Sequence, residues 1–228
     1  MHPNLQTAYS STLADSRQKV LRNTYALLGL SMIPAVLGAI VGTNLAYYFF
    51  VSPIMFTVGF LIATYGLMFA VEKNRYSSTG AYLMFVLTFV MGLWLGPLLQ
   101  IALHLKNGPA LIATAAGATS LIFLVMATIG ATTKRDFRGL DGFLTTGIIV
   151  LLVCIIANLF LHLPIFQLII AGGIAIFSAL TIMRQVNLVV EGGETSYISA
   201  ALTIFVMIYN LFSSLLQILI AISGNNRN

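Results

Sequence analysis

Long apolar runs separated by short polar links make up most of this chain. A membrane-spanning helix needs about 20 consecutive, predominantly apolar residues. Seven stretches have that length: 24–45, 51–71, 79–103, 109–132, 142–161, 164–183 and 198–222. The pattern therefore predicts an all-α membrane protein with seven transmembrane helices.

The same pattern divides the chain into three parts. Residues 1–23 are polar, with little aromatic or β-branched content and no helical period, so we expect a disordered tail there. Residues 24–223 hold the seven helices, and 224–228 form a short second tail. The first apolar run begins only near Thr24 and is too long for a signal peptide, so we expect it to remain as the first helix.

Proline and glycine add detail to the predicted helices. The first link carries no charge and is predicted from Asn44, the Tyr47–Tyr48 pair and Pro53, which suits the first turn of a helix. Pro34 and Pro97 fall inside predicted helices and should kink them.

Small residues are expected to let helices pack closely, because lipid gives them little hydrophobic reason to associate. Gly38 and Gly42 in the first helix, Gly92 and Gly96 in the third, and the Ala- and Gly-rich run 110–117 in the fourth supply such positions.

Composition supports solvation by lipid. Only 7% of the residues are charged and 59% are hydrophobic, against about 25% charged in soluble domains. The net charge of +5 comes from short links without a basic, aromatic-interleaved stripe, which argues against nucleic acid as a partner. Cys154 is the single cysteine, so no disulfide or cysteine-based metal site forms within one chain.

The basic residues predict the orientation in the membrane. Nine lie in the first tail or in links on the same side, and two, Lys106 and Arg227, lie on the other side. The nine are Arg17, Lys19, Arg22, Lys73, Arg75, Lys134, Arg135, Arg138 and Arg184. Because positive charge is enriched in cytoplasmic loops, the N-terminus is predicted to be cytoplasmic and the C-terminus external.

No constellation for catalysis is visible. His104 and His162 lie in predicted external links and His2 in the tail, so no two share a helix at metal-ligand spacing. Asp136 and Asp141 are expected to pair with Arg135 or Arg138, or to cap the fifth helix. We therefore expect no enzyme activity, cofactor or metal.

Polar residues near the link between the last two helices have two interpretations. Glu191 and Glu194 could attract cations to the mouth of a path. Alternatively, Glu194 favours the positive end of the last helix while Thr195 or Ser196 caps it. Polar side chains on these helices, which include Arg184, Gln185 and Asn210, either join helices by hydrogen bonds or line a conduction path.

Six short stretches in order along the chain carry a family resemblance. They are KVLRNTY (19–25), YGLMF (65–69), LGPLL (95–99), ANLFLHLP (157–164), GGETSYI (192–198) and YNLF (209–212). With these stretches the chain resembles the Bax inhibitor-1 family of membrane proteins, and within it the bacterial YccA-type branch.

The resemblance implies six helices around a central seventh, and one of two activities. The first is non-enzymatic modulation of the FtsH protease of the bacterial inner membrane, with the tail around Arg17, Lys19 and Arg22 as a contact. The alternative is a pH-sensitive calcium leak channel. The channel-like members carry an aspartate pair on the last two helices, at positions that match Gln185 and Met207 here. Neither residue ionises, and Arg184 would disfavour a divalent cation, so the first activity is our hypothesis.

Overall fold

The computed structural model describes residues 3–133 and 138–225, and this part of the chain is almost entirely helical. The helices are α1 (Pro3–Asn44), α2 (Ala46–Val51), α3 (Pro53–Lys73), α4 (Ser78–Leu103), α5 (Gly108–Thr132), α6 (Arg138–Leu161), α7 (Pro164–Glu191) and α8 (Tyr197–Asn225). All except α2 contain a segment long and apolar enough to span a bilayer. The predicted all-α class and seven spanning helices are therefore confirmed.

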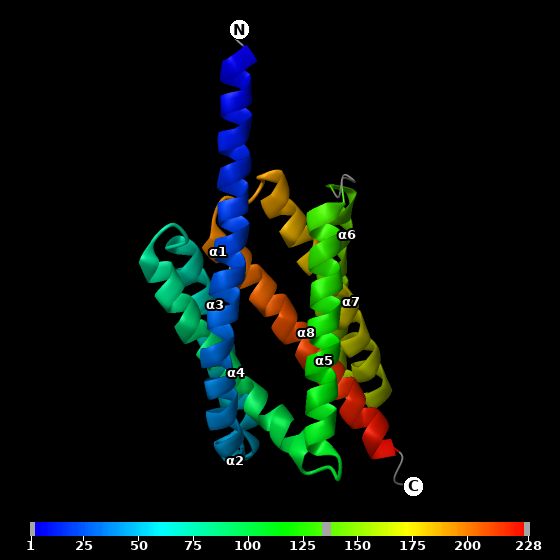
Figure 1. The fold of residues 1–228 in the computed structure, drawn as a ribbon. Helices are drawn as coiled ribbons and strands as arrows, with labels where there is room; N and C mark the ends of the chain where they lie inside the picture. The colour runs from blue at the N-terminus through cyan, green and yellow to red at the C-terminus, as the bar shows by residue number, and fades with distance from the viewer. Residues whose placement is uncertain (1–2, 134–137, 226–228) are drawn as a thin grey trace.

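Helix α8 is the centre of the bundle. It contacts α1, α3, α4, α5 and α7, and Figure 1 shows it crossing diagonally between them. Its Ile198, Ala201 and Ile204 are fully buried against core residues of α1 and α4, such as Leu28 and Met84. The expected central helix is confirmed, with one difference: among the described residues, α6 contacts only α7.

The closest helix crossing joins α1 to α4 through four glycines. A Cβ placed on Gly38 would lie 2.1 Å from the carbonyl oxygen of Phe89, and one on Gly92 would lie 2.1 Å from that of Ala35. Gly96 would meet the backbone of Gly42 in the same way. Backbones at this distance leave no room for a side chain, so the predicted role of these glycines in close packing is confirmed.

Two boundaries differ from the prediction. Residues 1–23 were expected to be disordered, whereas α1 begins at Pro3 and continues without a break into the bundle. Pro3 suits a first turn, and no glycine or further proline interrupts the chain before Gly29. Helix α7 extends to Glu191, eight residues beyond the predicted end at 183, and stops at Gly192, whose φ of 83° is left-handed.

The first link also contains structure. It forms the short helix α2, and Pro53 occupies the predicted first turn of α3. Pro34 and Pro97 lie inside α1 and α4 as expected.

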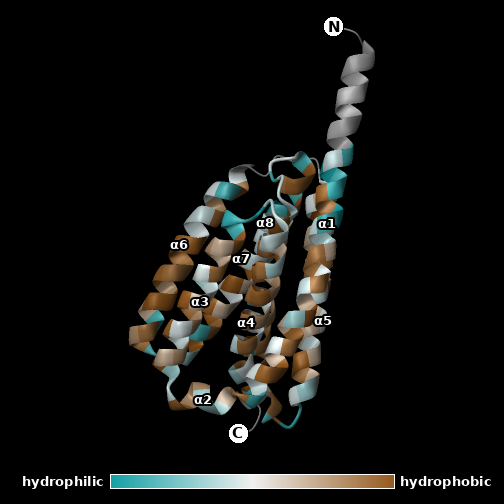
Figure 2. Ribbon diagram, turned by 90° about the vertical axis from the view of Figure 1, so that its left-hand side faces the viewer, coloured by the Kyte–Doolittle hydropathy of each residue, from teal (hydrophilic) through white to brown (hydrophobic). Residues whose placement is uncertain are grey.

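The outer surface of the bundle is apolar. Figure 2 shows hydrophobic residues along the length of the helices and hydrophilic ones gathered at the end that holds the α7–α8 link. Helix α6 exposes many large side chains, among them Ile149, Val153 and Phe160. Such a surface is stable only in lipid, so the chain is a multi-pass membrane protein and the bilayer is its solvent.

Candidate functional site

A charged cluster joins α6 to α7 near one end of the bundle. Arg184 donates from Nε to Asp141 Oδ1 over 2.5 Å and from Nη2 to Asp141 Oδ2 over 2.7 Å. The Arg184 side chain is 8% exposed, whereas that of Asp141 is 51% exposed. This bidentate pairing fixes the guanidinium in a geometry that a single contact would not.

Two further residues of α7 complete the cluster. Arg184 Nη1 donates to Asn187 Oδ1 over 3.2 Å, and the Asn187 amide donates to the carbonyl oxygen of Gly130 on α5. Glu191 lies 4.0 Å from Arg184 Nη1. The cluster therefore ties three helices together and compensates a buried positive charge.

The structure gives Asp141 a partner that the sequence did not suggest, Arg184. Asp141 was expected to pair with Arg135 or Arg138, or to cap its helix; it lies in the first turn of α6, as the second expectation requires, and pairs with Arg184. Arg135 and Asp136 lie outside the described residues, as does the side chain of Arg138. A signal was present in the sequence, because a lone arginine at the end of a spanning segment needs a carboxylate.

A second cluster joins the α3–α4 link to the α7–α8 link. Ser196 Oγ donates to the carbonyl oxygen of Arg75 over 2.7 Å and accepts from the Ser199 amide. The amide of Ser196 also donates to Glu194 Oε1 over 2.8 Å. Ser196 is therefore the N-cap of α8, and the Glu194 carboxylate accepts a hydrogen bond at the same turn, as the capping interpretation predicted.

Two side-chain contacts extend this cluster across the helices. The Ser199 hydroxyl donates to Glu72 Oε2 over 2.7 Å. Tyr76 and Thr195 share a hydrogen bond of 3.1 Å between their hydroxyls. Sequence reasoning missed both contacts, because nothing in either link indicates that they lie side by side.

The basic residues of the first tail lie on α1 beside these links. Arg17, Lys19 and Arg22 are all exposed. A Cβ placed on Gly192 would lie 2.7 Å from Arg17 Nε, so the Arg17 guanidinium packs directly on the C-terminal turn of α7. The negative end of a helix dipole favours a cation there.

The remaining predicted site residues are half-buried on α7 and α8. No hydrogen bond or ion pair within the described part of the chain joins the side chains of Gln185, Met207 and Asn210. Gln185 and Met207 carry no ionisable group, so these positions do not form a carboxylate pair. Within the described ranges, no three His, Cys, Asp or Glu residues are placed to share a metal ion.

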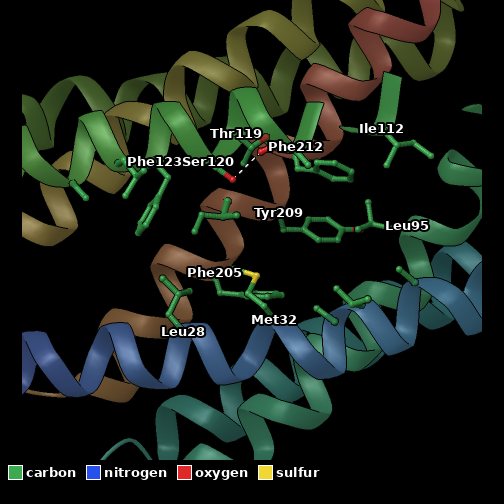
Figure 3. Close-up of a pocket in the computed structure, with 18 of the residues that line it drawn as sticks. Leu28, Met32, Leu95, Ile112, Thr119, Ser120, Phe123, Phe205, Tyr209 and Phe212 are labelled. Carbon is green, nitrogen blue, oxygen red and sulfur yellow. Dashed lines mark hydrogen bonds between the residues drawn. The ribbon is translucent and has the colours of Figure 1, made fainter. Parts of the chain in front are cut away.

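A large groove opens on another side of the molecule, between α1 and α5. Its volume is about 1240 Å³, and α8 and the end of α4 form its floor. Figure 3 shows Met32 of α1, Phe123 of α5 and Tyr209 of α8 directed into it. The groove was not predicted from the sequence, because the helices that line it are apolar on their lipid-facing sides as well.

Comparisons with known proteins agree on one family. Residues 17–225 match the family model described as "Inhibitor of apoptosis-promoting Bax1". A protein of Neisseria meningitidis is 44% identical over 92% of this chain and 94% of its own. A protein of Escherichia coli K12 with the name "Modulator of FtsH protease YccA" is 36% identical over 94% of this chain and 95% of its own. The same level of identity is found in an E. coli O6:H1 protein with the name "Inner membrane protein YccA".

Proposed function

Because this chain belongs to the Bax inhibitor-1 family, we propose that it is a non-enzymatic regulator of membrane-protein quality control that binds and modulates the FtsH protease. The E. coli relative that carries this activity in its name aligns over nearly the full length of both chains, so the comparison extends over all seven spanning helices. We further propose that the protein resides in the inner membrane, as the name of a second relative indicates for that protein.

The observation that carries the proposal is the exposed basic surface formed by Arg17, Lys19 and Arg22. These residues lie on the part of α1 that precedes the bundle core, beside the α7–α8 link. Lys19, Arg22 and the exposed side of Arg17, which also packs on α7, present positive charge that attracts an acidic surface of a partner. In the orientation that we propose, with the N-terminus cytoplasmic, this surface faces the cytoplasm.

Neutralising this surface tests the proposal. The triple variant Arg17→Gln, Lys19→Gln, Arg22→Gln keeps the length of the helix and leaves the other basic residues of that side in place to hold the orientation. We expect co-purification of FtsH to fall at least about fivefold, because each lost cation near an acidic surface weakens attraction.

Lys106→Gln, which removes a charge at the opposite end, is the control and should leave co-purification unchanged. Deletion of residues 2–16 should also change the turnover of the protein itself in cells with active FtsH. Unchanged co-purification in the triple variant, together with unchanged turnover of the deletion, would refute the proposal.

A further inference from the structure

We propose that the groove between α1 and α5 is the seat of a transmembrane helix from another protein. Helices α1 and α5 both pack on α8, while their backbones stay apart and their side chains meet in the ring pair of Tyr25 and Phe123, with centroids 6.3 Å apart. The space between them is the groove, and it is open to the side where lipid or a partner would lie. The proposal deepens the proposed function, because a membrane protease and its substrates supply such helices.

The groove has the length of a spanning helix. Its lining runs from Leu21 to Asn44 along α1 and from Ile112 to Thr132 along α5. At 1.5 Å per residue these stretches cover about 30–35 Å, which matches the hydrocarbon thickness of a bilayer. An occupant that fills the groove therefore crosses the membrane from one side to the other.

The walls admit a helix backbone at close range. Helix α5 presents Ala116, Ser120 and Thr128 to the groove, and a Cβ on Gly29 of α1 would meet no atom within 4 Å. The hydroxyls of Ser120 and Thr128 donate to carbonyl oxygens one turn back on α5, over 2.9 and 2.7 Å, so they need no other partner. Small residues without unmet hydrogen bonds are typical of surfaces on which membrane helices pack.

The Tyr209 hydroxyl favours a helix over lipid as the occupant of the groove. Its side chain lies at the floor of the groove (Figure 3), and its hydroxyl makes no hydrogen bond to a described residue. Tyr209 lies about 18 Å along α8 from Tyr197, which places it near the bilayer midplane. Acyl chains offer the Tyr209 hydroxyl no hydrogen-bond acceptor at that depth. A transmembrane helix does, in the form of Ser, Thr, Asn or Gln side chains.

Site-specific photo-crosslinking in the full-length protein tests this seat. Leu124 lines the groove and is 60% exposed, whereas its neighbour Val125 is 46% exposed and points outside the groove. We would place p-benzoylphenylalanine at each position in turn, in cells that express FtsH. The groove position should give a crosslinked peptide from a transmembrane segment of another protein, at least about fivefold more than the neighbour. In the groove variant, an added Tyr209→Phe substitution should lower the yield about threefold, as expected for one interhelical hydrogen bond.

Crosslinks to lipid alone, to a second copy of this chain, or in equal yield at both positions would each overturn the inference. Co-purification of FtsH from the same membranes separates this inference from the proposed function. If FtsH co-purifies while the groove position crosslinks no helix, the groove inference fails and the proposed function stands. If the groove position crosslinks a helix of a different protein and FtsH does not co-purify, the groove inference stands and the proposed function fails.

Discussion

At the scale of the residue, the charged cluster around Arg184 shows how a nearly uncharged bundle keeps a cation inside. Arg184 has Asp141 on one side and Asn187 and Glu191 of its own helix on the other. The two ends of the ion pair differ in environment, because the arginine is 8% exposed and the aspartate 51% exposed. Removing Asp141 leaves a charge in a buried environment, whereas removing Arg184 leaves one that solvent reaches, so the two substitutions should differ in their effect on stability.

This asymmetry predicts unequal costs. Asp141→Leu removes both short hydrogen bonds of the bidentate pair from a buried guanidinium, leaves it the longer contact to Glu191, and should lower the free energy of unfolding by about 3 kcal/mol. Arg184→Met leaves a half-exposed carboxylate that solvent can reach, and should cost only about 1 kcal/mol. The double variant should recover most of the loss. Denaturation with sodium dodecyl sulfate in detergent micelles measures all three, and equal costs for the single variants would contradict the prediction.

At the scale of the element, the glycine pairs of α1 and α4 set how closely two helices approach. Gly38→Val forces a side chain against the carbonyl oxygen of Phe89 and should destabilise the bundle by about 2–3 kcal/mol, the upper part of the usual range for overpacking, because the atom it meets is backbone. Gly66→Val on α3 is the matched control, since a Cβ there meets no atom within 4 Å. Thermal unfolding in micelles should show a clear drop for the first variant and little change for the second. Similar drops in unfolding temperature for the two variants would show that the close α1–α4 crossing is not the cause of the destabilisation.

The elements were largely predictable from the sequence, and the contacts between them only in part. Hydrophobic length alone locates all seven spans, and the spacing of Gly38, Gly42, Gly92 and Gly96 indicates a close crossing. The end of α7 was placed too early because Arg184 looks like a residue at the edge of a membrane, whereas its pairing with Asp141 lets the helix continue. The groove was unpredictable because it depends on which helix backbones stay apart in the folded bundle.

At the scale of the whole molecule, the two ends of the bundle differ in charge. The end with the α3–α4 and α7–α8 links holds Arg17, Lys73 and Arg75, and Lys106 lies in the α4–α5 link at the other end. This asymmetry predicts a cytoplasmic N-terminus and an external C-terminus. Alkaline phosphatase fused after the last residue should be active, and fused after Ser77 should be inactive. The opposite result would invert the orientation.

The continuity of α1 from Pro3 into the glycine crossing has a mechanical consequence. A protease that pulls on the N-terminal end transmits force along one continuous helix. That load first reaches the tightest interface in the bundle, where backbone packs on backbone. Extraction would then be limited by the rate at which α1 separates from α4. A chain of this kind engages such a protease for longer than one whose first helix separates easily from the bundle.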